Sequence, residues 1–191
     1  MNPSLTSFIA AAAFSTSAIA APAVYNIDPQ HTFPSFEGDH FGLSVWRGKF
    51  TRTSGNITMD RTAGTGTVEV SIDATSIDFG LPAMTEHAVG TEFLDTKKFP
   101  QVLYKGKLAG FTNSAPSTVQ GELTLHGVTR PVELHINAFK CMPHPMLKRE
   151  VCGADALATF KRDDFGLSAG KDYGFNMEVT VRIQIEAIKA P

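Results

Sequence analysis

The sequence predicts an all-β fold: a single closed antiparallel β-barrel of about eight strands, with one short helix near residues 82–94. The main observation is that apolar residues occupy every second position in several segments, most clearly at residues 68–79 and 175–185. This is the period of a strand with one buried face. The second observation is that short polar turns join these segments. Alternating strands joined by short turns are typical of a sandwich or a barrel, and about eight of them favour closure into a barrel.

The expected strands follow the alternation along the chain. They cover residues 25–28, 32–37, 46–52, 55–59, 66–73, 102–108, 118–126, 130–137, 154–161 and 175–187. In the last strand, one side would carry Phe175, Met177, Val179, Val181, Ile183 and Ile185. Residues 126–131 place a glycine in the turn and a proline just after it, which predicts a hairpin between two alternating runs. Residues 162–166 predict another turn before the last strand.

One segment has a helical rather than an alternating pattern. Between residues 82 and 94, one helix face would carry Ala83, Met84, His87 and Ala88. The proline at position 82 suits the first turn of a helix. A single short helix beside a barrel is a candidate lid or plug.

The first residues resemble a targeting segment rather than part of the fold. Residues 8–20 are almost wholly apolar or small and end in Ala18-Ile19-Ala20. This pattern predicts a signal peptide over residues 1–20, cleaved after Ala20 or, as the alternative, after Ala23. The apolar run is about 13 residues long, whereas a membrane span needs about 20. We therefore expect an exported protein whose single domain covers residues 24–189.

The charge and composition of the chain limit the classes of binding partner that the sequence predicts. The chain has 17 basic and 19 acidic residues, giving a net charge of -2. Lysine and arginine do not cluster among aromatic residues, so the sequence does not predict a nucleic-acid-binding protein.

The two cysteines, Cys141 and Cys152, are the only ones in the chain. In an exported protein such a pair predicts one disulfide, which would stabilise the fold by about 3 kcal/mol in the chain-entropy model. The alternative is a redox or metal-binding thiol pair, but the spacing is not Cys-x-x-Cys. Because Pro143 and Pro145 lie between the cysteines, we expect regular strand pairing to fail in this loop.

Neither a metal site nor a catalytic site is predicted. The six histidines show no His-x-His or His-Glu-x-x-His spacing. Several carboxylates lie beside serine, threonine or glycine, where turn hydrogen bonds explain them. With the cysteines expected to be paired, no nucleophile stands out.

Four motifs, in order along the chain, give the sequence a family resemblance. They are IDPQHT at 27–32, SIDATSID at 71–78, FLDTKKFP at 93–100 and GELTLHGVTRPV at 121–132. Together they resemble the YceI-like family over residues 25–188. The resemblance implies a periplasmic, lipocalin-like barrel that binds a polyisoprenoid chain. Pro34 and Gly38 depart from the family pattern, and we expect the barrel to fray or kink there.

An isoprenoid tail has no polar groups, so a tunnel that holds it must be lined by apolar side chains. The predicted lining residues are Phe36, Val68, Val70, Ile72, Val102, Tyr104, Leu123, Leu125, Leu134, Ile136, Phe160, Val179, Val181 and Ile183. The alternative is that the same residues fill a small barrel as ordinary core. The candidate head-group contacts are His40, Trp46, Arg47 and His87, although Arg47 could instead pair with a neighbouring acid such as Asp39.

The resulting hypothesis is a carrier that requires no cofactor and holds a polyprenyl phosphate or an isoprenoid quinone as its ligand. Transient membrane contact would load and release the lipid, because the bilayer is as apolar as the tunnel. Further candidate partners are a periplasmic or membrane redox protein and a second copy of the chain. The first alternative is a filled-core interaction or stress-related protein without a lipid, and the second is a small lipid-modifying enzyme.

Overall fold

The computed structural model describes residues 21–191, so the predicted signal peptide lies outside the described residues. The strands are β1 (Ala23–Ile27), β2 (Phe33–His40), β3 (Ser44–Phe50), β4 (Thr53–Asp60), β5 (Thr65–Asp73), β6 (Ile77–Asp78), β7 (Gln101–Ala109), β8 (Thr118–Leu125), β9 (Val128–Pro131), β10 (Leu134–Pro143), β11 (Glu150–Lys161) and β12 (Glu178–Lys189). The helical elements are α1 (Pro82–Val89) and three short 3₁₀ helices, η1 (Ala74–Ser76), η2 (Arg162–Phe165) and η3 (Lys171–Tyr173).

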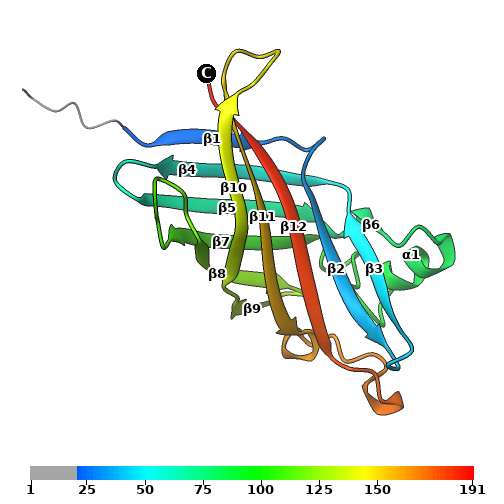
Figure 1. The fold of residues 1–191 in the computed structure, drawn as a ribbon. Coiled ribbons are helices and arrows are strands. Elements are labelled where there is room, and N and C mark those ends of the chain that lie inside the picture. Colours follow the sequence, from blue (N-terminus) through cyan, green and yellow to red (C-terminus); the bar gives the residue numbers. More distant parts are fainter. Residues whose placement is uncertain (1–20) are drawn as a thin grey trace, which may run out of the picture.

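Eight antiparallel strands close into a barrel (Figure 1). Their order is β1, β4, β5, β7, β8, β10, β11 and β12, and β12 pairs back with β1. The prediction of a closed, eight-stranded antiparallel barrel with one short helix is therefore confirmed within residues 21–191. The helix α1 is eight residues long, and within the same residues no helix has the length and apolar character needed to cross a membrane.

The barrel wall is extended at one end by β2, β3 and β6. Strand β12 is twelve residues long; its last residues pair with β1 and its first half pairs with β2. Strand β2 continues into a hairpin with β3, which also pairs with β6. Figure 1 shows the β2–β3 turn and the η3 segment at one end of the barrel, and the β10–β11 turn at the other.

The expected fraying at Pro34 and Gly38 is wrong. Strand β2 is continuous from Phe33 to His40 and pairs with β12 along most of its length. Pro34 lies one residue before the stretch that pairs with β3, so it takes an edge position on that side, where a proline is tolerated.

The segment between the cysteines also differs from expectation. Cys141 and Cys152 form the predicted disulfide, with their Cα atoms 4.0 Å apart. They are direct partners in the β10–β11 ladder, which continues to Pro143 and Glu150. Regular pairing survives because Pro143 is the last paired residue, and only residues 144–149 form the turn.

Several further boundaries differ from those expected: for example, α1 ends at Val89 rather than near residue 94, and β11 begins at Glu150 rather than at residue 154. The predicted strand over 130–137 is divided between β9, which pairs with β8, and β10, which starts at Leu134. The last strand begins at Glu178 rather than at residue 175, because residues 162–177 form η2, η3 and their loops. Phe175 and Met177 therefore precede the strand that the alternation assigned to them.

Candidate ligand-binding cavity

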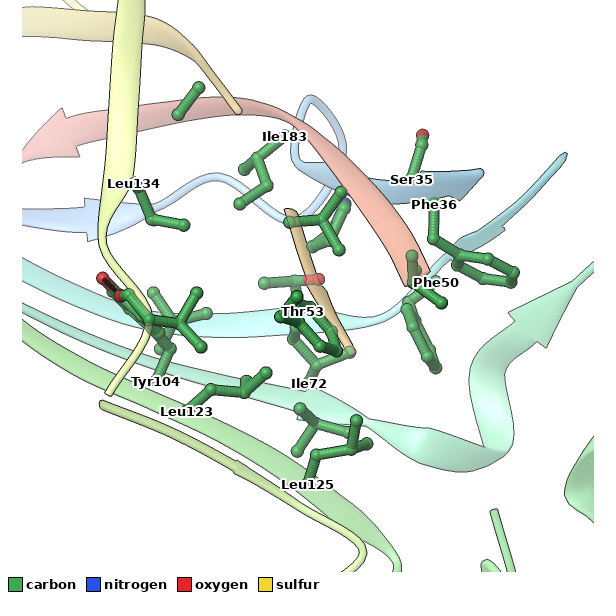
Figure 2. Close-up of a pocket in the computed structure, with 18 of the residues that line it drawn as sticks. Ser35, Phe36, Phe50, Thr53, Ile72, Tyr104, Leu123, Leu125, Leu134 and Ile183 are labelled. Atoms are coloured by element: carbon green, nitrogen blue, oxygen red, sulfur yellow. Dashed lines mark hydrogen bonds between the residues drawn. The ribbon is translucent and has the colours of Figure 1, made fainter. Parts of the chain in front are cut away.

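The barrel encloses a cavity of about 520 Å³, within the range of about 300–1,000 Å³ that is usual for small-molecule sites. Side chains from strands on all sides of the barrel point into one shared space (Figure 2). All fourteen predicted lining residues lie on its wall: Phe36, Val68, Val70, Ile72, Val102, Tyr104, Leu123, Leu125, Leu134, Ile136, Phe160, Val179, Val181 and Ile183. That they bind a lipid stays a prediction.

Strand alternation explains why the lining is apolar. In β12, Val179, Val181, Ile183 and Ile185 line the cavity, whereas the residues between them do not. One of the latter, Arg182, bonds to Glu37 of β2 on the outer surface, at 3.0 Å. A closed barrel thus separates an apolar interior from a charged exterior with the two faces of the same strands.

Tyr104 is a bulky polar side chain buried in the wall. Its hydroxyl oxygen lies 2.8 Å from the carbonyl oxygen of Val132 and 3.2 Å from that of Val119, so it has a partner without any ligand. Burial raises the pKa of Tyr104, which keeps the phenol neutral. A Cβ at Gly121 would lie 2.6 Å from the Tyr104 hydroxyl oxygen, so this strand position requires glycine.

Two buried threonines line the cavity, and their hydroxyl groups differ in hydrogen bonding. Thr32 is 1% exposed, and its hydroxyl bonds with the backbone of Glu186 through both the carbonyl oxygen, at 3.2 Å, and the N–H, at 3.1 Å. Thr53 is 4% exposed, and its hydroxyl has no hydrogen-bond partner among residues 21–191. Figure 2 shows Thr53 among hydrocarbon side chains of the cavity.

At the end near β1, the cavity is closed by buried groups. Tyr25 is 3% exposed, and its hydroxyl donates a hydrogen bond to the carboxylate of Glu150. Burial, with the neighbouring Glu150 carboxylate, raises the pKa of Tyr25 to about 12. The disulfide lies beside this end, since Cys152 lines the cavity as well.

The opposite end is the mouth of the cavity. Here Trp46 lines the cavity and is still 36% exposed. His40 stacks on Trp46 with ring centroids 4.3 Å apart, and Phe175 packs edge-on against His40 at 5.5 Å. The helix α1 contributes Met84 and His87 to the same wall. Of the four predicted head-group contacts, the structure thus brings His40, Trp46 and His87 to the cavity.

The fourth, Arg47, does not line the cavity within the described residues. It alternates with Trp46 along β3 and therefore faces outward. Its guanidinium bonds to Glu37 at 2.9 Å, so the neighbouring acid is Glu37 rather than the Asp39 suggested by the sequence. Asp39 instead accepts hydrogen bonds from the backbone N–H of Gly42 in the β2–β3 turn.

One cationic residue at the mouth was missed by the sequence analysis. Arg162 follows β11 and lines the cavity beside Phe93 of the segment after α1. Its position in a polar turn, residues 162–166, concealed it, because a turn arginine is usually solvated. One feature of the sequence could have identified Arg162: it follows directly after an alternating strand, where the chain reaches one end of the barrel.

Residues 166–170 read Gly-Leu-Ser-Ala-Gly, which matches the pattern of a hydrolase nucleophile elbow. That chemistry needs a sharp strand-to-helix turn and a histidine bonded to the serine. Here the segment joins η2 to η3, and the exposed Ser168 has no histidine partner among residues 21–191. Lys171, three residues on, pairs with Asp163 at 2.7 Å. The match is therefore one of sequence pattern alone.

Among residues 21–191, potential metal ligands meet at two places that the spacing of residues could not indicate. Cys141, Glu150 and Cys152 converge at one of them, but the two sulfur atoms are bonded to each other. Asp28, His31 and Glu186 converge at the other. There His31 bonds to Asp28 at 2.8 Å, which raises the pKa of the histidine. Neither group lies at the mouth.

The fold and cavity together define a class: closed antiparallel barrels whose apolar interior is hollow rather than filled. A family model described as the YceI-like domain matches residues 25–187. The chain therefore belongs to the YceI-like family, as the sequence motifs indicated.

A sequence relative agrees with this assignment, and two solved structures share the fold. The chain is 30% identical over 199 residues to Protein YceI of Salmonella arizonae, and the match covers 99% of each chain. Among solved structures, it is similar to BcnA of Burkholderia cenocepacia, with a TM-score of 0.67, 19% identity and coverage of 84% of this chain and 99% of the other. It is also similar to a polyisoprenoid binding domain from Saccharophagus degradans, with a TM-score of 0.64, 17% identity and coverage of 88% and 99%.

Proposed function

We propose that the protein is a non-catalytic periplasmic carrier that holds an isoprenoid lipid, a polyprenyl phosphate or an isoprenoid quinone, inside its barrel. The observation that carries the proposal is the apolar cavity of about 520 Å³. A barrel that served only as a filled core would have closed this space with side chains, because protein interiors pack densely. The family and the polyisoprenoid binding relative support the same ligand class.

One sequence feature and one structural feature support the proposed periplasmic location. Residues 1–20 resemble a signal peptide, and the disulfide between Cys141 and Cys152 suits an oxidising compartment. Fractionation of cells followed by N-terminal sequencing tests this, with a mature chain beginning at Ala21 as the expected result. A full-length chain in the cytoplasm would contradict it.

Loading is proposed to take place at a lipid bilayer, through an apolar rim around the mouth. We define the mouth rim as Phe41, Leu43, Trp46 and Tyr173, which are 47%, 82%, 36% and 80% exposed. The rim is continuous with the cavity, because Phe41 packs on Phe175 with ring centroids 4.0 Å apart and Phe175 lines the cavity. A tail moving from bilayer to cavity stays in apolar surroundings, whereas release into water costs about 0.8 kcal/mol for each CH₂.

The lipid proposal is tested by native mass spectrometry of the protein purified from its own host, followed by solvent extraction and mass analysis of the released molecule. Replacing Val181 with Trp fills the cavity from β12 and should abolish the added mass. The matched control is Gln184→Trp, which puts the same side chain on the outer face of the same strand. Equal lipid in both variants, or no lipid in the wild type after incubation with isoprenoids, would refute the proposal.

A further inference from the structure

Arg162 places a cation in the mostly apolar wall of the cavity. It lines the cavity and is half-buried. Its two terminal nitrogens donate hydrogen bonds to the carbonyl oxygens of Leu167 and Ala169, both at 2.6 Å. A guanidinium has five N–H groups. Three therefore remain without an acceptor among residues 21–191, while the two bonds hold the plane of the group in one orientation.

The charge of Arg162 has no carboxylate partner in the described part of the chain. The adjacent Asp163 forms no ion pair with Arg162: its Oδ2 bonds to Lys171 at 2.7 Å, and its buried Oδ1 has no hydrogen-bond partner among residues 21–191. Burial lowers the pKa of Arg162, with only partial compensation from Asp163. A half-buried cation without a counter-ion is unfavourable unless an anion or further acceptors reach it.

Two aromatic rings lie beside Arg162 in the wall of the cavity. Its guanidinium carbon lies 5.8 Å from the ring centroid of Phe93, and the ring of His87 packs against the same phenyl group at 4.9 Å. Phe93 thus brings the guanidinium and an imidazole into one wall of the mouth. The carboxylate of Asp39, which also lines the mouth, already accepts the N–H of Gly42.

We propose that Arg162 is the anion-binding group of the cavity, and that the carried lipid ends in a phosphate seated against this guanidinium with its tail inside the barrel. The inference rests on the proposed function and selects between its two ligand classes, favouring a polyprenyl phosphate over a quinone. Phosphate oxygens are well matched to the planar N–H groups of arginine, which can bind them in pairs. The ring of His87 lies in the same wall of the cavity.

The test compares two probes with the same C15 tail, farnesyl phosphate and farnesol, together with the short isoprenoid quinone ubiquinone-2 and inorganic phosphate. Trp46, the only tryptophan of the chain, lines the mouth and reports binding by fluorescence. The wild type should bind farnesyl phosphate at least about tenfold more tightly than farnesol or the quinone, a preference consistent with one charge-assisted contact. Inorganic phosphate alone should not bind at millimolar concentration, because it lacks the tail.

Arg162→Gln should reduce the phosphate-to-alcohol preference to about one while leaving farnesol affinity within about twofold. Arg162→Lys, which keeps the positive charge but loses the planar guanidinium group, should show an intermediate preference for farnesyl phosphate over farnesol. The matched control is Arg47→Gln, on the outer face of β3, which should change nothing. A purely structural role for Arg162 would weaken both probes equally and leave their ratio intact, and that result would overturn the inference.

The remaining outcomes are also decisive. If the wild type binds neither farnesyl compound, the carrier function fails. If it binds both equally, the carrier function stands and only the phosphate assignment fails. If inorganic phosphate binds as tightly as farnesyl phosphate, then Arg162 forms a site for free phosphate, and the assignment of a lipid head group to this site is overturned. If the Arg162→Gln variant does not fold, ¹⁵N NMR spectra of the arginine side chains in the wild type provide the test instead. One arginine Nε–H signal should shift when farnesyl phosphate is added and should not shift with farnesol. The absence of any shift with farnesyl phosphate would overturn the inference.

Discussion

Replacing Thr53 with Val should stabilise the ligand-free protein. The Thr53 hydroxyl is buried, at 4% exposure of the residue, without a hydrogen-bond partner among residues 21–191. A buried polar group left unpaired costs about 1–3 kcal/mol. A water molecule could relieve this only if it found two to four polar partners, and Thr53 lies among hydrocarbon side chains. Valine keeps the shape and the β-branch of threonine, so the strand should tolerate it.

We therefore expect the free energy of unfolding to rise by about 1 kcal/mol or more in Thr53→Val. The matched control is Thr32→Val at an equally buried position of the same cavity. Thr32 bonds with the backbone of Glu186 through both its donor and its acceptor function. Its removal leaves the Glu186 N–H without its partner, whereas the Glu186 carbonyl keeps the hydrogen bond from the Asp28 N–H at 2.9 Å. The loss should cost about 1–3 kcal/mol, so the two variants should change stability in opposite directions.

The assay is urea unfolding of delipidated protein, followed by fluorescence of Trp46 and by far-UV circular dichroism. Thermal unfolding provides a second measurement, because 1 kcal/mol shifts the midpoint of a protein of this size by about 2–4 °C. If Thr53→Val is destabilised as much as Thr32→Val, then the Thr53 hydroxyl has a partner in solution, and the cavity there is more polar than the structure indicates.

Three further predictions concern the disulfide, the mouth rim and a surface ion pair. Alkylation without reductant should add no mass at Cys141 or Cys152, whereas reduction should lower the free energy of unfolding by about 3 kcal/mol; two labels without reductant would mean free thiols. Leu43→Ser should slow lipid transfer to vesicles without changing the affinity for the lipid. Met146→Ser, whose native side chain is equally exposed at 82% but lies at the other end of the barrel, should leave the transfer rate unchanged. Equal transfer rates in the two variants would contradict the proposed role of the mouth rim in loading. The hydrogen bonds of Glu37 to Arg182 and Arg47 lower the pKa of its carboxyl group in the folded protein. The ionised carboxylate should therefore stabilise the fold fully above the unfolded-state pKa of about 4.3, and this contribution should be lost as the pH falls through the lower pKa of the folded state. The urea midpoints of wild type and Glu37→Gln should accordingly differ at pH 7 and converge at pH 2, and a difference independent of pH would refute the ionic contribution.

The inward faces of the barrel were predictable, because alternation is visible within a single strand. Val179, Val181 and Ile183 illustrate this, since their spacing alone assigned them to the interior where the structure places them. The disulfide was predictable for a different reason: the chain has only two cysteines. Its setting within a paired ladder was not, since prolines between the cysteines appeared incompatible with pairing until the strand register placed Pro143 at its end.

The polar features of the site could not be predicted in the same way. Arg47 and Arg162 are both arginines near a turn, and the sequence favoured the wrong one as a cavity residue. Arg47 faces outward because it alternates with Trp46 in β3, whereas the folding of η2 over the barrel end directs Arg162 toward Phe93. Likewise, nothing in the sequence distinguishes Thr32, which has partners, from Thr53, which lacks them.

Side-chain alternation and turn residues are local properties, and they were sufficient to predict an antiparallel barrel with apolar inward faces. The closure of the barrel between β12 and β1, the hollow interior and the guanidinium at the mouth follow only from the three-dimensional fold. These properties depend on which distant segments meet. Strand register and loop packing set the partners of each polar group, and no local pattern encodes those partners.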